Sequence, residues 1–239
     1  MFSGGLESCL LLHLASPWRE KVTVYALRTN LDFPHMIEFV DQKLTDWSHR
    51  VIQVDLTASF QQYGLPSSVV PVDHMPDMAQ RLAFNQRQPL IQPWLTCCFI
   101  NRTKPLLDAV HADGLRAVVH GQRAGDFEKL PTTGPKMPSH PELEPVYPLW
   151  PMSRTEVFET VKALGIKIPY HYKEYPSSLD CSVCPASLTS ERRAWMSQRY
   201  PAFLQGAEAL EKTIRGAVMT AMDADNTSCS REETQKISC

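Results

Sequence analysis

The sequence predicts an α/β fold: an open, mostly parallel sheet with helices on both faces and a helical C-terminal extension. Short β-branched runs alternate with helical patterns through short links, which is typical of parallel strands joined by crossover helices. A Ser-Gly-Gly turn precedes the first helical pattern, and a strand-like run at 117–120 leads directly into Gly121. Because ligands bind at the carboxyl ends of such strands, we expect the loops at Ser3 and Gly121 to share the functional edge.

The expected elements follow from periodicity and from start and stop signals. β-branched and aromatic runs predict strands, and apolar residues at helical spacing predict helices. Ser153 and Glu156 form a capping box that starts one helix, and Gly165 ends it. The expected strands are 22–27, 51–54 and 117–120, and the expected helices begin inside the glycine loop (ending at Ser16), at Phe33-Pro34, and over 97–112, 153–164 and roughly 188–221.

Two stretches give no regular pattern. Prolines interrupt 55–85, and 131–151 is so dense in proline that we expect irregular structure, either a lid across the end of the sheet or a spacer. The predicted organisation is a domain over 1–186 that includes the proline-rich loop 131–151, a helical element over 187–222 and a polar, disordered tail over 223–239.

Composition excludes several classes of protein. The formal net charge of -2 argues against a broad electrostatic nucleic-acid binder. No apolar run reaches the length of a membrane span, and the start lacks the pattern of a secretory signal. We therefore expect a cytoplasmic, reduced protein, in which the seven cysteines serve metal or catalytic roles rather than disulfides.

Four of these cysteines form two tight pairs, Cys97-Cys98 and Cys181-Ser-Val-Cys184. Four thiolates brought together by a fold are the ligand set of a tetrahedral zinc ion or of a cubane iron–sulfur cluster. The pairs lie far apart in sequence, so a metal held by them would join two parts of the fold. The alternative is two buried cysteines near a turn that binds nothing.

The second chemical signal is the loop that opens the chain. Gly4 and Gly5 let the backbone turn tightly and approach a ligand, and Ser3 and Ser8 can donate hydroxyl hydrogen bonds to phosphate. The apolar helix that follows would aim its N-terminal amides at an anion. The alternative is a glycine turn with no ligand.

Together these motifs resemble the phosphoadenosine phosphosulfate (PAPS) and adenosine phosphosulfate (APS) reductase family, within the PP-loop adenine-nucleotide superfamily. Ser3-Gly-Gly-Leu-Glu-Ser8 resembles the SGGxDS phosphate loop, and Gly121-Gln-Arg123 resembles a Gly-x-Arg at a strand end. Three further segments match the family pattern. The first is 29–39, which contains Phe33-Pro34. The second is Cys97-Cys98 with Arg102 and Pro105-Leu106 after it, and the third is Ile168-Pro-Tyr170 with Tyr175, which precede Cys181-x-x-Cys184. The resemblance covers residues 3 to about 185.

The resemblance implies a site and a cofactor. The domain 1–186 would bind an adenine nucleotide, APS, PAPS or ATP. Its phosphate or sulfate groups would lie against Arg123 and the loop residues Ser3, Gly4, Gly5, Glu7 and Ser8. In the APS-type branch the two cysteine pairs ligate a [4Fe-4S] cluster, here Cys97, Cys98, Cys181 and Cys184, with Arg102 near it either offsetting cluster charge or simply exposed. Zinc is the alternative metal.

This chain departs from the family pattern at several positions. Glu7 stands where the family has aspartate, only Met1 and Phe2 precede the loop where a strand is usual, and Asp180 and Pro185 replace a glycine and a threonine. The mobile Glu-Cys-Gly-Leu-His segment, whose cysteine attacks the sulfate sulfur in the reductases, is not in this sequence. Cys229 and Cys239 are the only tail cysteines and are weak candidates for a nucleophile.

Three hypotheses follow. The first is reduction of APS or PAPS to sulfite, or sulfur transfer, with a thioredoxin-like thiol donor. The second is ATP-dependent adenylation and sulfur transfer to a nucleic acid or small molecule, as in sulfur-modifying relatives. The third is a non-catalytic nucleotide-binding protein with structural zinc. No membrane partner is expected, and self-association is expected from the relatives.

Overall fold

The structure, a computed structural model, describes residues 1–68, 91–126, 140–179 and 181–235, with side chains up to residue 220. The chain divides into two compact units, which we describe separately. Unit 1 comprises Met1–Val54 and Ile100–Cys181, and unit 2 comprises Asp55–Phe99 and Ser182–Cys239. These units group residues by contact rather than by order along the chain. The predicted boundary at 186 therefore stays a prediction.

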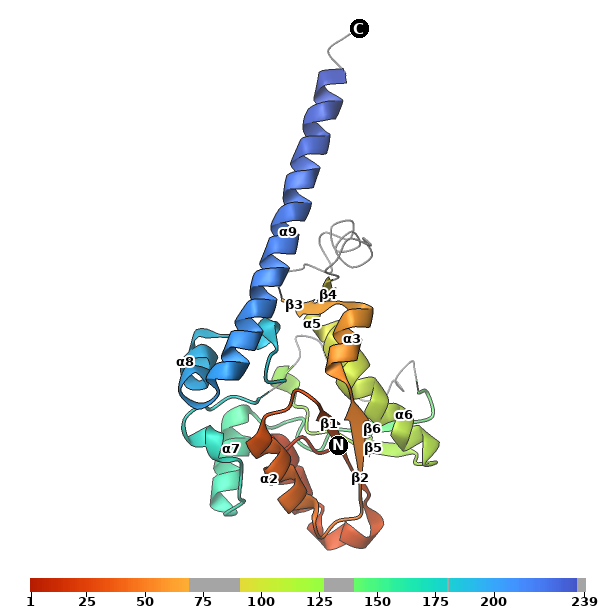
Figure 1. The fold of residues 1–239 in the computed structure, drawn as a ribbon. Helices are drawn as coiled ribbons and strands as arrows, with labels where there is room; N and C mark the ends of the chain where they lie inside the picture. Colours follow the sequence, from red (N-terminus) through yellow and green to blue (C-terminus); the bar gives the residue numbers. More distant parts are fainter. Residues whose placement is uncertain (69–90, 127–139, 180, 236–239) are drawn as a thin grey trace. The chain divides into compact units, whose positions relative to one another are not determined.

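Parallel strands form the centre of unit 1 (Figure 1). Strand β1 (Val24–Thr29) pairs in parallel with β2 (His49–Val54), and β5 (Ala117–Val119) pairs in parallel with β6 (Glu144–Val146). Residues at the start of the chain lie between these two pairs: Phe2 bridges Ala26, and the Met1 amino group donates to the Val119 carbonyl at 2.9 Å. The α/β class is confirmed, with its described strands in three two-stranded parallel sheets.

Side-chain alternation along β1 explains why helices cover both faces of it. Tyr25 belongs to a buried cluster with α6 (Lys104–Ala112), whereas Val24 and Ala26 belong to a cluster with α1 (Leu6–Leu14) and α2 (Pro34–Leu44). Successive strand residues point to opposite faces, so a strand buried on both sides reads as a continuous apolar run. Helix α7 (Arg154–Ala163) packs on α1 through Leu6, Leu10, Val157 and Val161.

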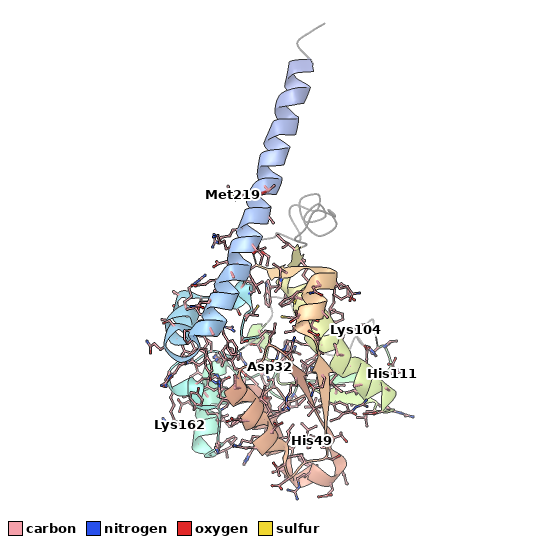
Figure 2. The ribbon with its side chains drawn as sticks, viewed as in Figure 1. Asp32, His49, Lys104, His111, Lys162 and Met219 are labelled. Atoms are coloured by element: carbon pink, nitrogen blue, oxygen red, sulfur yellow. The ribbon has the colours of Figure 1, made fainter. Side chains whose placement is uncertain are left out.

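The loop after β1 is closed by a side chain. The Asp32 carboxylate accepts hydrogen bonds from the Thr29 amide at 2.8 Å and from the Thr29 hydroxyl at 2.7 Å (Figure 2). Phe33 then caps α2, with Pro34 as its first residue, where the missing N–H costs nothing. The predicted helix start at Phe33-Pro34 is confirmed, as is the capping box that begins α7 at Ser153.

Two predicted helices are each divided by a proline. The helix expected over 97–112 is instead α5 (Trp94–Cys98), a π-helical turn η2 (Phe99–Thr103) and α6, because Pro105 removes an N–H and crowds the preceding turn. The stretch expected over 188–221 is α8 (Ser190–Arg199) and α9 (Pro201–Gln235), since Tyr200 leaves the helical region before Pro201.

The proline-rich segment contains a strand, contrary to the expectation of irregular structure throughout 131–151. Strand β6 includes Pro145 because its ladder bonds use neighbouring groups: the Glu144 amide donates to Arg116, and the Val146 carbonyl accepts from His120. A proline is tolerated where the ladder does not need its N–H. The part of this prediction that falls on 131–139 lies outside the described residues.

Unit 2 is built around a short parallel pair and the C-terminal helices (Figure 1). Strand β3 (Leu65–Ser67) pairs with β4 (Ile91–Pro93), and Ile214 of α9 packs on Ile91. Helix α9 continues to Gln235, so the change to a disordered tail expected at 223 is not seen over 223–235. In the part of the chain that the structure describes, no helix is long and apolar enough to span a bilayer.

Helix α3 (Leu56–Tyr63) in unit 2 was not predicted, and its start depends on one side chain. The Asp55 carboxylate accepts from the amides of Thr57 at 2.9 Å and Ala58 at 3.1 Å. We expect Asp55→Ala to lower the free energy of unfolding by about 1 kcal/mol, because these two amides lose their acceptor. Urea unfolding would measure it, and Asp55→Asn, which keeps a capping oxygen, should remain near wild type. Equal losses in both variants would contradict the capping role.

Candidate functional site

The predicted phosphate loop forms the first turn of α1. Gly5 caps the helix in an extended conformation, and the Ser3 hydroxyl accepts from its amide at 3.3 Å. The Ser8 hydroxyl donates to the Gly5 carbonyl at 3.0 Å and lies 3.4 Å from the Ser3 hydroxyl. The structure thus brings both predicted hydroxyls together at a helix N-terminus, where backbone amides face outward without intrahelical acceptors.

Gly4 is the residue that this turn requires. Its φ of 79° lies in the left-handed region, and an added Cβ would stand 2.9 Å from the Met36 methyl and 3.2 Å from a Val40 methyl of α2. Gly5 has a φ of -71°, and its nearest neighbour would be the Ser3 hydroxyl at 3.4 Å. Backbone conformation and packing therefore both require glycine at position 4, whereas neither requires it at position 5.

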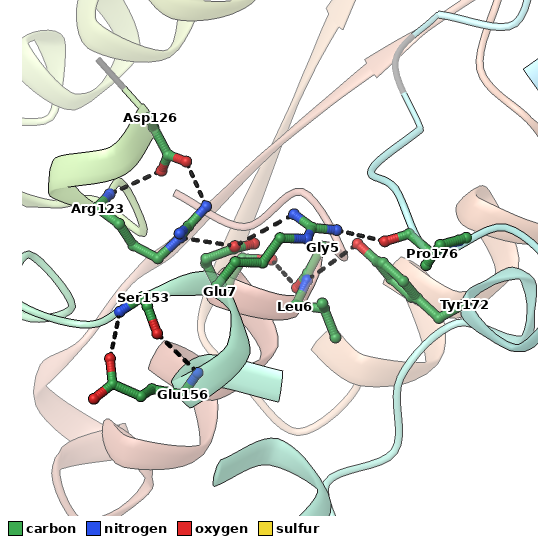
Figure 3. A network of polar contacts seen from close by, with 11 residues as sticks. Gly5, Leu6, Glu7, Arg123, Asp126, Ser153, Glu156, Tyr172 and Pro176 are labelled. Carbon is green, nitrogen blue, oxygen red and sulfur yellow. Dashed lines mark hydrogen bonds and ion pairs between the residues drawn. The ribbon is translucent and has the colours of Figure 1, made fainter. Parts of the chain in front are cut away.

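Arg123 reaches the same turn from the loop after β5 (Figure 3). Its guanidinium donates to the Glu7 carboxylate at 3.1 Å and to the Asp126 carboxylate at 2.5 Å, and its side chain is 8% exposed. The Asp126 carboxylate also accepts from the Arg123 amide at 2.9 Å. The loop approaches closely because Gly121 carries no Cβ: an added one would lie 3.0 Å from Glu7 Cβ.

A second guanidinium completes this group of charges. Arg154, the first residue of α7, has Nη1 3.9 Å from the Glu7 carboxylate and donates from Nη2 to the Pro176 carbonyl at 2.5 Å. Two guanidiniums and two carboxylates therefore surround the first turn of α1. Such an arrangement can exchange an internal carboxylate for a phosphate or sulfate group, since guanidinium pairs with either.

The hydroxyl of Tyr172 lies on the other side of the turn. It accepts from the Leu6 amide at 3.3 Å, and burial raises the pKa of this tyrosine. Sequence reasoning missed Tyr172, Arg154 and Asp126 as members of the site. The capping box marked Arg154 as the start of a helix, but no local pattern shows that α7 packs on α1.

Three histidines flank the site: His120 and His171 are buried, and His35 is half-buried. His35 Nε2 lies 3.3 Å from His171 Nδ1, a pairing between residues 136 positions apart that no local pattern predicts, and His120 stacks on Tyr147. Burial lowers the pKa of each of these histidines from 6.5 to about 4. They are therefore neutral at pH 7 and serve as packed aromatic rings.

These pKa shifts predict acid sensitivity. Between about pH 6.5 and 4 these histidines are protonated in the unfolded chain but neutral in the folded protein. The free energy of unfolding should therefore fall as the pH falls through this window. His120→Phe keeps a ring against Tyr147 but cannot be protonated, so the decline should become shallower. Urea unfolding at pH 7, 6 and 5 would measure both slopes. Parallel curves for wild type and variant would contradict the assignment to His120.

The predicted metal ligands are divided between the units. Cys97 and Cys98 lie on α5 and Cys184 precedes η5 (Pro185–Ser187), all in unit 2, while Cys181 ends unit 1. All four carry reduced thiols. Within the described residues, no three His, Cys, Asp or Glu side chains are grouped so that they could hold a metal ion. The four-cysteine site stays a prediction.

Arg102 and the tail cysteines complete the list of predicted residues. Arg102 is partly buried and donates from Nη1 to Cys181 Sγ at 3.4 Å; its role beside a metal site stays a prediction. Cys229 lies on α9 where side chains are not described, and Cys239 lies outside the described residues. Cys9 is buried with a pKa raised to about 12 by desolvation, which makes it a poor nucleophile.

Comparisons with known proteins add the family. Two solved structures are similar in part: phosphoadenylyl-sulfate (PAPS) reductase from Candida auris in a phosphate complex, and the U34-tRNA thiolase NcsA from Methanococcus maripaludis with its [4Fe-4S] cluster. The reductase is 14% identical with a TM-score of 0.48, and the match covers 75% of this chain and 78% of the reductase chain. The thiolase is 14% identical with a TM-score of 0.44, and the match covers 88% of this chain and 69% of the thiolase chain.

Sequence comparison is more decisive. Among curated protein sequences none matches this chain significantly. A family model of the phosphoadenosine phosphosulfate reductase domain matches residues 1–187, which include the phosphate loop, the Arg123 loop and both cysteine pairs. This match covers most of the chain, and the protein therefore belongs to the phosphoadenosine phosphosulfate reductase domain family.

Proposed function

We propose that this protein is an enzyme that binds an adenine sulfonucleotide, APS or PAPS, at the Ser3–Ser8 loop and releases or transfers its sulfur. The observation that carries the proposal is the meeting of two distant loops at the first turn of α1. There Arg123 contacts Glu7 at 3.1 Å, and Gly121 allows the approach. A guanidinium and a helix N-terminus at one point form an anion site.

Each residue of the site has a defined task in this proposal. The outward amides of the α1 turn and the Ser3 and Ser8 hydroxyls would donate hydrogen bonds to the phosphate or sulfate oxygens. Arg123, held rigid by Asp126, would stabilise charge that develops on the leaving oxygen when the sulfur–oxygen bond breaks. A dithiol donor of the thioredoxin kind would supply two electrons and become a disulfide as sulfite and the nucleotide leave.

We further propose that Cys97, Cys98, Cys181 and Cys184 hold a [4Fe-4S] cluster. The fit rests on the donor chemistry, four reduced thiols, and on Arg102, whose guanidinium already donates to Cys181 Sγ as a positively charged neighbour of a cluster ligand would. When bound, the cluster would supply a redox-capable centre, and the Arg102 guanidinium would offset the negative charge of its thiolate ligands. Zinc held by the same thiols is the structural alternative.

Metal content tests the cofactor. Protein purified without oxygen should contain about four iron atoms and four acid-labile sulfides per chain, with a broad visible absorption band, as the assigned cluster type requires. A Cys181→Ser variant should lose most of this iron, whereas a Cys9→Ser variant should keep it. Zinc without iron would replace the cluster by a structural metal, and no metal in either variant would remove the cysteines from the proposal.

Sulfite release tests the reaction. With a reduced thiol donor, APS or PAPS should give sulfite, and Arg123→Met should reduce the rate at least tenfold while Arg28→Met, which loses an ion pair with Asp41 in the same unit, should leave it unchanged. Binding of either nucleotide without sulfite from either would favour a non-catalytic nucleotide-binding protein. Absence of binding would refute the proposed site.

One observation favours a second candidate, ATP-dependent adenylation. Glu7 and Asp126 place two carboxylates beside Arg123, and Mg²⁺ with a nucleotide phosphate commonly uses one or two such carboxylates. Release of pyrophosphate from ATP in the presence of Mg²⁺, without sulfite from APS or PAPS, would select this candidate. Its sulfur acceptor would be a nucleic acid or a small molecule.

A further inference from the structure

The segment that leads to Cys181 belongs to unit 1 and follows a short helix beside the phosphate loop. Helix η4 (Tyr170–Lys173) is followed by residues 174–179, and the Glu174 and Tyr175 amides both donate to the His171 carbonyl, at 2.9 and 2.7 Å. We call residues 174–179 the Cys181 segment. The His171 ring also bonds to the Ser177 backbone. Two further side chains connect this segment to the phosphate loop.

Tyr172 makes the first of these connections. Its hydroxyl accepts from the Leu6 amide at 3.3 Å and also hydrogen-bonds with the Ser178 side chain. One oxygen atom therefore joins the first amide of α1 to the middle of the Cys181 segment. The ring is buried against Leu6 and Leu10, which restricts other positions of the hydroxyl.

Arg154 makes the second connection. Its Nη2 donates to the Pro176 carbonyl at 2.5 Å, and its Nη1 lies 3.9 Å from the Glu7 carboxylate. The same guanidinium therefore contacts the Cys181 segment on one side and the phosphate loop on the other. The guanidinium is planar, so a rotation that improves one contact changes the direction of the other.

Both connections use the groups of the loop that an anion would need. A phosphate or sulfate that accepts from the Leu6 amide takes the donor that Tyr172 now uses, and an anion beside Arg154 competes with Glu7. We propose that Tyr172 and Arg154 are positioning residues that couple occupancy of the phosphate loop to the placement of the Cys181 segment, and hence of Cys181. This inference rests on the proposed anion site.

Hydrogen–deuterium exchange of the full-length protein, as purified without oxygen, tests the connections directly. In the unliganded protein, Tyr172→Phe and Arg154→Met should each raise exchange in peptides from 174–179 at least threefold. Two controls are placed elsewhere: Tyr170→Phe on η4, whose ring faces His35, makes the same change as Tyr172→Phe, and Lys162→Met, exposed on α7, removes a positive charge as Arg154→Met does (Figure 2). Unchanged exchange in the two test variants, or equal changes in the controls, would overturn the proposal.

Adding inorganic pyrophosphate tests the coupling. In wild type, pyrophosphate should protect peptides from 3–9 and change the exchange of 174–179. In the Tyr172→Phe/Arg154→Met double variant it should still protect 3–9 but leave 174–179 unchanged. Protection of 3–9 without any response of 174–179 in wild type would overturn the coupling. Lack of protection at 3–9 in wild type would instead refute the anion site, while the unliganded comparison still decides whether the two residues position the segment.

Discussion

Gly4→Ala is expected to lower the free energy of unfolding by about 2–4 kcal/mol. About 1–2 kcal/mol follows from placing a side chain at a φ of 79°, and the rest from overpacking, because the new Cβ would stand 2.9 Å from the Met36 methyl. Helix α2, which carries Met36 and Val40, must shift or the turn must change. Urea unfolding at neutral pH would measure the loss.

Gly5→Ala is the matched control for this prediction. Gly5 has an ordinary extended conformation, and its nearest contact for a Cβ, at 3.4 Å, is a rotatable hydroxyl. The free energy of unfolding of Gly5→Ala should therefore stay within about 1 kcal/mol of the wild-type value. The lower entropy of the unfolded chain can even make the variant slightly more stable than wild type. Equal stability losses for the two alanine variants would contradict the distinction between the glycines.

Arg123→Met is expected to cost about 2–4 kcal/mol of unfolding free energy and at least tenfold in affinity for an adenine nucleotide. The guanidinium is 8% exposed and the Glu7 carboxylate 15%, so the change leaves a largely buried carboxylate without its main partner. Asp126, which is 32% exposed, keeps more of its hydration and moderates the cost. Urea unfolding and isothermal titration calorimetry with ATP and PAPS would measure the two effects.

Three variants separate charge from geometry in this prediction. Arg28→Met removes a more exposed ion pair and should change stability by no more than about 1 kcal/mol. Arg123→Met with Glu7→Gln should recover part of the stability because no unpaired carboxylate remains, but not the affinity. Arg123→Lys should recover charge without the forked geometry. Stability of Arg123→Met equal to that of Arg28→Met would show that the buried pair contributes little.

Local signals in the sequence were sufficient for much of the fold. The glycine loop, the Phe33-Pro34 start and the Ser153–Glu156 capping box each specify an element through bonds within a few residues, and each is found in the structure. The elements that differ from the expectation have equally local causes. Pro105 and Pro201 divide two helices, Asp55 caps a helix that the prolines obscured, and Pro145 lies in a strand that does not need its amide.

The sequence by itself determined the α/β class and the glycine loop at a helix N-terminus, and it singled out Arg123 and the cysteine pairs, because each is written in adjacent or regularly spaced residues. Only the tertiary structure decided what surrounds them. Glu7, Arg123 and Arg154 meet because α7 packs on α1 and Gly121 permits close approach, and Tyr172 reaches the Leu6 amide across 166 positions of sequence. Such contacts arise from the burial of apolar faces on elements distant in the chain, and no local pattern records which faces will meet.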